Sequence, residues 1–95
     1  MKQWDVLVEV SPRAEIADPA GLTIERALDA LGFAGVSGVR VGKAIRLEVT
    51  APDAEAARAV TEQMCERLLA NPVIEDARIE LMLRDNSHGS LDADN

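Results

Sequence analysis

Two side chains of this 95-residue sequence could act as a nucleophile or a general base, Cys65 and His88, and each is the only residue of its type. A thiol becomes a good nucleophile when a neighbouring base or positive charge lowers its pKa. Cys65 instead adjoins Met64 in a stretch with helical periodicity, where a small buried thiol is the common outcome. His88 lies in a polar segment of Asn, Ser and Gly, so we expect it to be solvated. The sequence therefore predicts no catalytic residue.

Two further patterns resemble ligand sites but lack the required geometry. Glu75 and Asp76 are adjacent carboxylates, yet neighbours on a strand point to opposite faces and cannot address one substrate atom. Gly32, Gly35 and Gly38 recur at every third position, but they precede a predicted strand rather than opening a helix, so we expect turn glycines and no phosphate loop. A single cysteine also cannot build a zinc site of several thiolates. We predict that this chain binds no metal and no cofactor.

The composition indicates one acidic globular domain in the cytoplasm. Ten basic residues against seventeen acidic ones give a net charge of −7, which repels a nucleic-acid backbone. The apolar runs are far shorter than the roughly 20 residues that span a bilayer, and the chain opens with no signal-peptide pattern. One cysteine fits a reducing compartment. We expect a soluble protein that binds neither nucleic acid nor membrane.

Alternation and helical spacing predict the elements of the first half of the chain. Residues 4–10 read as a half-buried strand that presents one row of apolar side chains to the core, Trp4, Val6, Val8 and Val10. After Pro12, the sequence Asp18-Pro19-Ala20-Gly21 supplies a turn. Thr23 is placed to cap a helix that Gly32 ends. Its core-facing stripe follows helical spacing: Ile24, Ala27, Leu28 and Leu31.

The second half predicts a hairpin, a helix and a last strand. Residues 39–41 and 45–49 alternate on either side of Gly42-Lys43-Ala44, and pairing their apolar rows requires that three-residue loop. Pro52 opens a helix that Asn71-Pro72 stops. Its predicted core face is again a helical stripe: Ala57, Val60, Met64 and Leu68. Val73 to Arg84 alternates as a long terminal strand.

The resulting order, β-α-β-β-α-β, predicts an α+β fold of ferredoxin-like topology, with a four-stranded antiparallel sheet and both helices on one face. Residues 1–84 form the single domain, and 85–95 form an acidic tail without periodicity that we expect to be disordered. The last strand is expected to be longer than the first. An unpaired part of it would then be available to a second copy of the chain.

Three basic residues stand out on this acidic chain, Arg40, Lys43 and Arg46. The three-residue loop would set Arg40 across from Arg46 on the outer face of the hairpin, and like charges in direct opposition are destabilising. In one interpretation Glu9 and Glu48 neutralise them in a charge ladder. In the other, the three form a basic docking point for an acidic partner protein. Both interpretations remain open at this stage.

Several segments read together resemble the PurS subunit of bacterial phosphoribosylformylglycinamidine (FGAM) synthase. The likeness covers nearly residues 4–81, and its most specific piece runs across the second helix into the last strand. The pieces that carry it are Asp18-Pro19-Ala20-Gly21, Val39-Arg40-Val41-Gly42-Lys43 and Met64-Cys65-Glu66-Arg67-Leu68-Leu69-Ala70-Asn71-Pro72-Val73-Ile74-Glu75-Asp76. The acidic tail and Ala44 depart from the pattern.

This resemblance implies a non-catalytic subunit in purine biosynthesis. It would pair with itself as a dimer or tetramer and bridge the synthetase PurL and the glutaminase PurQ, supporting the transfer of glutamine-derived ammonia. ATP and Mg would be used by the synthetase and not by this chain. Two alternatives of the same topology are a ligand-binding regulatory domain and an acylphosphatase-like enzyme. The first loop, Ser11-Pro12-Arg13-Ala14-Glu15, has too little glycine for the latter.

Overall fold

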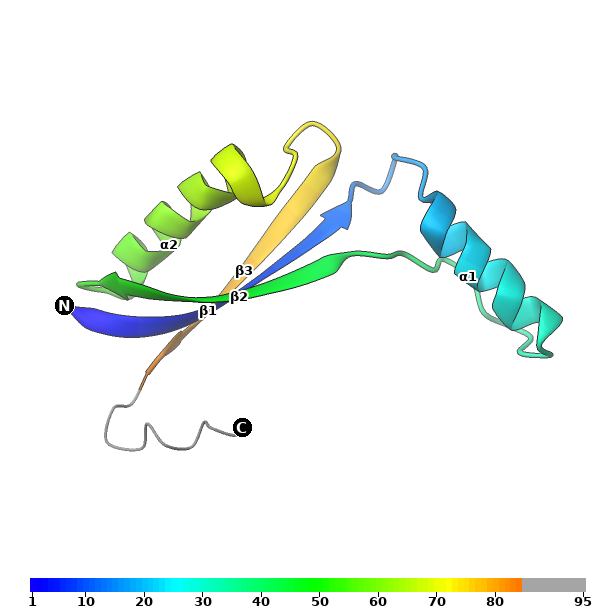
Figure 1. Cartoon of the computed structure of the whole chain (residues 1–95), viewed down its shortest axis with the longest axis horizontal. Helices are drawn as coiled ribbons and strands as arrows, with labels where there is room; N and C mark the ends of the chain where they lie inside the picture. The colour runs from blue at the N-terminus through cyan, green and yellow to red at the C-terminus, as the bar shows by residue number, and fades with distance from the viewer. Residues whose placement is uncertain (85–95) are drawn as a thin grey trace.

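The computed structural model describes residues 1–84 and shows three strands and two helices in the order β-α-β-α-β (Figure 1). The strands are β1 (Lys2–Pro12), β2 (Lys43–Ala51) and β3 (Glu75–Leu83). The helices are α1 (Pro19–Ala30) and α2 (Ala54–Met64), and a π-helical turn, η1 (Cys65–Leu69), continues α2. The strands form one antiparallel sheet in the order β2-β1-β3.

The core lies on the face of the sheet that α2 covers. β1 is the central strand, and its four inward side chains are buried: Trp4, Val6, Val8 and Val10. The register sets Val6 between Leu47 on β2 and Leu81 on β3. The prediction of a half-buried first strand is therefore confirmed. β1, with 11 residues, is longer than β3, with 9, so the expectation of a longer last strand was wrong.

Helix α2 is anchored by Asp53, whose side chain accepts a hydrogen bond of 2.8 Å from the amide of Ala56. Its buried face is formed by Ala57, Thr61 and, in η1, Cys65. The predicted stripe was only partly right. Ala57 is fully buried, but Val60 is 37% and Leu68 is 82% exposed. Since side chains on this flank of the helix meet no second helix, they remain at the surface.

The predicted four-stranded sheet is wrong, because residues 39–41 form no strand. Their amides are taken by side chains of the preceding segment: Val39 donates to Glu25 at 3.2 Å, and Val41 donates to Asp18 at 2.8 Å. These groups are therefore unavailable for a hairpin ladder with β2. Residues 35–42 run beside α1 as an extended connection, and β2 begins only at Lys43.

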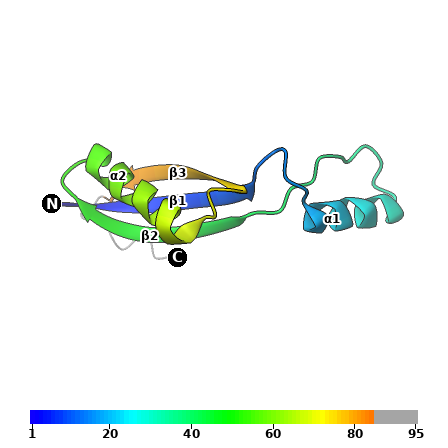
Figure 2. The same cartoon turned by 90° about the horizontal axis from the view of Figure 1, so that it is seen from above.

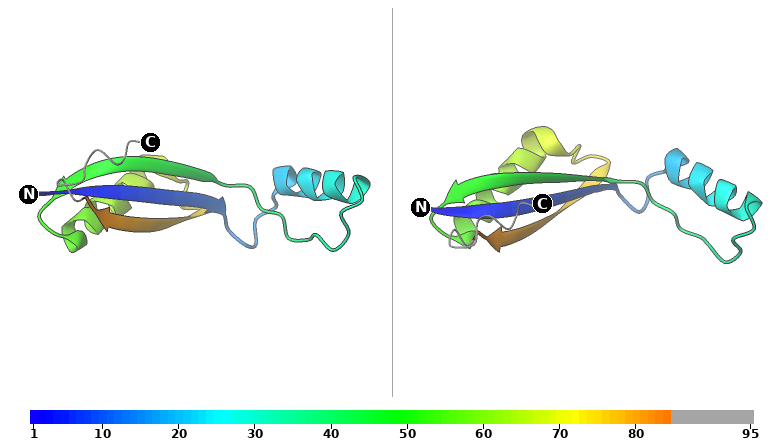
Figure 3. Two further views of the ribbon diagram at one scale, coloured as in Figure 1. Left: turned by 90° about the horizontal axis from the view of Figure 1, so that it is seen from below. Right: turned by 60° about the horizontal axis from the view of Figure 1, so that its bottom comes forward.

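The predicted packing of both helices on one face of the sheet is also wrong. α2 lies over the sheet, whereas α1 projects beyond the end where β1 stops and β2 starts (Figures 2 and 3). The helix starts at Pro19, and its cap is Asp18 rather than the predicted Thr23. The Cα radius of gyration is 17.3 Å, against about 12 Å for a compact domain of this length. One half of the sheet face consequently lacks the second helix.

Candidate interaction surfaces

The base of the projecting helix is held by Arg40. Its guanidinium donates hydrogen bonds to the backbone carbonyls of Pro12, Arg13 and Ile16, at 3.2, 2.7 and 3.2 Å. It also lies 4.0 Å from the carboxylate of Asp18. Three carbonyl acceptors on one guanidinium fix the path of the chain between β1 and α1. We call α1 together with residues 31–42 the arm, and Arg40 holds the arm in its extended direction.

Asp18 ties the two ends of the arm together. One carboxylate oxygen accepts from the amide of Gly21 at 3.0 Å, and the other accepts from Val41. These two backbone hydrogen bonds, with a smaller contribution from the Arg40 charge, lower the pKa of the Asp18 carboxyl below its ordinary value. Gly21 is required by close approach, since a Cβ there would stand 2.1 Å from the carbonyl oxygen of Val39. The Asp-Pro-Ala-Gly motif thus caps helix α1 and contacts Val39 and Val41, rather than forming a simple turn.

The three predicted docking residues do not form the expected cluster. Arg46 is exposed on β2 and lies opposite Leu7 of β1, and Lys43 is the first residue of β2. Arg40 lies outside the sheet and is occupied by backbone carbonyls, so the predicted opposition of Arg40 and Arg46 is wrong. Within residues 1–84, Lys43 and Arg46 make no ion pair. Their role in an interface stays a prediction.

A charge ladder does exist on the outer face of the sheet, with other cations than those predicted. Glu9 lies 3.5 Å from Arg78, and Glu48 accepts from Arg84 at 2.7 Å. Arg84 also contacts Asp5 at 2.5 Å, so it joins carboxylates of two strands, and these hydrogen bonds raise its pKa. The outer face is therefore a polar, cross-linked surface, in contrast to the apolar face beneath α2.

The apolar surfaces left uncovered lie on the arm and beside α2. On the arm, Ile24, Leu31 and Phe33 are 43%, 73% and 58% exposed, although the first two belong to the stripe predicted to face the core. Beside α2 lies a groove of about 490 Å³, which we call the apolar groove. It is lined by Ile45 and Leu47 of β2, Val60 and Met64 of α2, and Leu68 and Leu69 of η1, with Gln63 and Arg67 at its rim.

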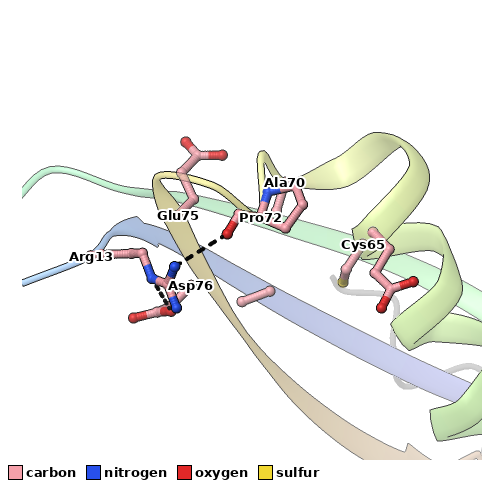
Figure 4. A pocket seen from close by; sticks show the side chains of 8 residues that line it. Arg13, Cys65, Ala70, Pro72, Glu75 and Asp76 are labelled. Atoms are coloured by element: carbon pink, nitrogen blue, oxygen red, sulfur yellow. Dashed lines mark hydrogen bonds and ion pairs between the residues drawn. The ribbon is translucent and has the colours of Figure 1, made fainter. Parts of the chain in front are cut away.

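A smaller hollow of about 250 Å³ lies near Arg13, at the start of β3 (Figure 4). The guanidinium of Arg13 donates to the carbonyl of Pro72 at 3.4 Å and lies 3.4 Å from the carboxylate of Asp76. Glu75 instead accepts from the amide of Asn71 at 2.7 Å. The adjacent carboxylates of Glu75 and Asp76 therefore bind different partners, the amide of Asn71 and the guanidinium of Arg13. Arg13 fastens the turn before β3 to the end of β1.

The remaining candidates from the sequence contribute no site geometry. Cys65 is buried, and burial, with the neighbouring Glu62 charge, raises the pKa of its thiol, which disfavours the thiolate. His88 lies outside the described residues. Gly32, Gly35 and Gly38 have positive φ; Gly32 and Gly35 lie in turns of the arm, whereas Gly38 lies in its extended connection. Among residues 1–84, no group of His, Cys, Asp or Glu side chains is arranged to hold a metal ion, and no helix is long and apolar enough to cross a bilayer.

Sequence reasoning missed the residues that hold the arm, Asp18, Glu25 and Arg40. One signal was present: an aspartate directly before a proline is a common helix start, because the side chain caps the helix and proline suits its first position. The contacts of Glu25 and Arg40 join residues far apart in sequence. No local sequence pattern predicts these long-range contacts.

Taken together, these features define an elongated α+β assembly subunit. The polar groups of the arm fix its own backbone, and apolar surfaces as exposed as those on the arm and beside α2 are typical of contacts with other chains. These features are typical of a small structural subunit of a larger assembly.

Comparison with known proteins narrows this class to one family. The family model described as PurS, phosphoribosylformylglycinamidine (FGAM) synthase, matches residues 5–83. The PurS subunit of Mycobacterium leprae is 49% identical over 72 residues, covering 74% of this chain and 85% of that protein. The PurS subunit of Synechocystis is 43% identical over 74 residues, 78% of this chain and 74% of that protein.

Solved structures agree with the sequence relatives. PurS of Methanocaldococcus jannaschii superposes with a TM-score of 0.78 at 34% identity, over 86% of this chain and 99% of that chain. A chain of the PurLQS structure of Thermotoga maritima gives 0.79 at 36% identity, over 86% of this chain and all of that chain. This chain belongs to the PurS family of FGAM synthase subunits. The identification from sequence is confirmed, and the alternative of a ligand-binding regulatory domain is not favoured.

Proposed function

We propose that this chain is a non-catalytic subunit that bridges the synthetase PurL and the glutaminase PurQ in the cytoplasm, supporting transfer of glutamine-derived ammonia. The observation that carries the proposal is the pair of uncovered apolar surfaces on an elongated member of the PurS family. A subunit of this kind positions the two catalytic subunits relative to each other and catalyses no step itself. The synthetase would bind and use ATP and Mg, and this chain would bind no cofactor.

Self-association is the second part of the proposal. In a single chain, the apolar residues of the arm and the apolar groove beside α2 are both open to water. Burying such surface stabilises a folded chain by about 25 cal/mol per Å². A small domain with a half-covered sheet gains more from a second copy than a compact domain would. The chain is therefore expected to be a dimer or a larger assembly.

Docking to the other subunits is assigned to Lys43 and Arg46, which are exposed and unpaired within residues 1–84. Reversing a charge at an interface can cost several kcal/mol when it meets a like charge. Lys43→Glu and Arg46→Glu are expected to weaken co-elution with PurL and PurQ, more strongly at low salt than at high salt. Lys2→Glu, at the opposite end of the sheet, is the matched control. Arg40→Glu is a poorer test because it also releases the arm.

The experiment for the bridging role is turnover of the reconstituted complex. Glutamine-dependent FGAM synthesis should fall strongly when this chain is left out, because the glutaminase product no longer reaches the synthetase. Turnover with added ammonium salt should fall much less, since free ammonia bypasses the bridge. Equal glutamine-dependent rates with and without the chain would refute the proposal.

A further inference from the structure

A third, smaller apolar surface is the turn that leads from η1 into β3, residues 72–74, which we call the apolar turn. Val73 and Ile74 are 74% and 40% exposed there, and Pro72 also lies at the surface. The apolar turn lies outside the arm, and none of its residues lines the apolar groove. It is therefore a surface separate from those described above.

The amides of this turn are bound within the chain. The side chain of Asn71 accepts from the amide of Val73 at 3.1 Å, and its carbonyl accepts from the amides of Ile74 and Glu75, at 3.1 and 2.8 Å. The carboxylate of Glu75 accepts in return from the amide of Asn71. One asparagine thus fixes the whole turn.

The carbonyls of the turn are bound by Arg13. Its guanidinium donates to the carbonyls of Pro72 and Val73, at 3.4 and 3.5 Å (Figure 4), and its amide donates to the carbonyl of Ile74 at 2.9 Å. Every backbone donor and acceptor of residues 71–74 therefore has a partner inside the chain, although the turn lies in water. Only the side chains of the turn remain available to another molecule.

A rigid turn with exposed apolar side chains is suited to enter a pocket on another protein. Association normally costs free energy to order the loops and side chains that meet at an interface. Here the backbone of the turn is already ordered by its contacts with Asn71, Glu75 and Arg13. A small number of buried anchor residues supply most of the binding free energy of an interface. Val73 has the exposure and the fixed backbone that such an anchor needs.

The charges beside the turn indicate the chemistry of the pocket. The hollow next to Pro72 is lined by three carboxylates, those of Glu66, Glu75 and Asp76, and by the guanidinium of Arg13. Arg13 lies 3.4 Å from Asp76, whereas Glu66 makes no ion pair within residues 1–84. The surroundings of the turn are therefore negative. Charge complementarity calls for an apolar pocket with a basic rim.

Of the two proposed partners, the synthetase fits this chemistry better. It must bind ATP and a phosphoribosyl substrate, which are both anionic, so we expect it to present more basic side chains than a glutaminase, whose substrate carries no net charge. Lys43 and Arg46 would suit an acidic partner instead. The two surfaces differ in charge and can hold different subunits.

We propose that the apolar turn docks this chain onto the synthetase PurL, with Val73 as the anchor in an apolar pocket that has a basic rim. The inference rests on the bridging function proposed above and names the contact for one of its two partners. Asn71 and Arg13 are positioning residues, because they hold the backbone from which Val73 projects.

The test is the affinity of the full chain for PurL in the presence of ATP and Mg. Val73→Lys should raise the dissociation constant by about thirtyfold or more, because the new charge meets an apolar pocket and a basic rim. Met82→Lys makes the same kind of change at a residue of the outer face that is 69% exposed, and should alter the constant by less than about threefold. Trp4 fluorescence reports that each variant is folded.

The positioning role has its own variants. Asn71→Ala removes the acceptor of the Val73 amide, so it should weaken binding to PurL about tenfold and speed amide exchange in residues 73–75. Asn71→Asp keeps an acceptor oxygen and should restore both values to within about threefold of the parent.

Three results would overturn the inference. If Val73→Lys bound PurL like the parent while glutamine-dependent turnover still required this chain, the docking turn would be wrong and the bridging function would stand. If Val73→Lys weakened binding to PurQ alone, the assignment to the synthetase would be wrong. If Val73→Lys abolished self-association in sedimentation, the turn would be a contact between copies of this chain.

Discussion

Replacing Gly21 by alanine should destabilise helix α1 if Gly21 lies against Val39 as described, and should stabilise the helix if that contact is absent. At an ordinary helical position this change stabilises a helix by about 1 kcal/mol. Here the new Cβ would stand 2.1 Å from the carbonyl oxygen of Val39 and 2.9 Å from a carboxylate oxygen of Asp18. The connection formed by residues 35–42 must move by more than 1 Å to restore ordinary contact, and overpacking of this kind costs about 1–3 kcal/mol. The movement also weakens the hydrogen bond from Val39 to Glu25, worth about 1.5–3 kcal/mol with a charged acceptor.

The net expectation is that Gly21→Ala lowers the opening free energy of the arm by about 2 kcal/mol, which is roughly thirtyfold faster amide exchange in α1. Hydrogen exchange measured by mass spectrometry resolves this locally, because the arm lies apart from the sheet (Figure 1). Trp4 fluorescence should show an unchanged core. Ala30→Gly calibrates the helix propensity at an exposed position. If Gly21→Ala slowed exchange in α1, the close contact between Gly21 and Val39 would be wrong.

Three other outcomes follow from the same contacts. Because hydrogen bonding lowers the pKa of Asp18 in the folded chain, its stabilisation of the arm is complete above the pKa of the unfolded state and is lost as the pH falls through the folded value. Protection factors in α1, which correct for the change of the intrinsic exchange rate with pH, should therefore fall at acid pH, and Asp18→Asn should remove this dependence. The raised pKa of the Cys65 thiol predicts slow alkylation of the folded chain at pH 8, and stability that declines above the ordinary thiol pKa; fast alkylation without unfolding would contradict its burial. Val8→Ala, in the centre of β1, should lower the unfolding free energy by about 2 kcal/mol or more in urea titration, whereas Leu7→Ala on the outer face should cost less than about 1 kcal/mol.

The sequence was informative where structure depends on local periodicity. Alternation from Trp4 to Val10 predicted the central strand, because a strand buried on one face needs apolar residues at every second position. Helical spacing likewise located both helices. It could not tell that the stripe of Ile24 and Leu31 faces away from its own sheet, since an apolar stripe shows that burial is needed and not which chain supplies it.

The prediction of a hairpin was wrong for a related reason. The alternation of Val39 and Val41 is real, but their amides bond to Glu25 and Asp18 instead of a neighbouring strand. A side-chain carboxylate satisfies a backbone donor as well as a carbonyl does. Periodicity cannot distinguish the two partners. Arg40 was consequently predicted on an outer sheet face, whereas it binds three carbonyls at the base of the arm. The resemblance to PurS, by contrast, depended on motif order and was unaffected by these errors.

Native mass spectrometry of this chain mixed with PurL and PurQ tests the central claim most directly, namely that this chain acts as a paired structural subunit of the synthase. Each copy adds 10.2 kDa, so the number of copies in the complex can be counted. We expect one assembly that contains all three proteins with an even number of copies of this chain. We expect that assembly to be lost when Leu31→Asp places a charge on the exposed apolar surface of the arm and separates the copies. A stable, active complex of PurL and PurQ that contains a single copy, or none, would contradict it.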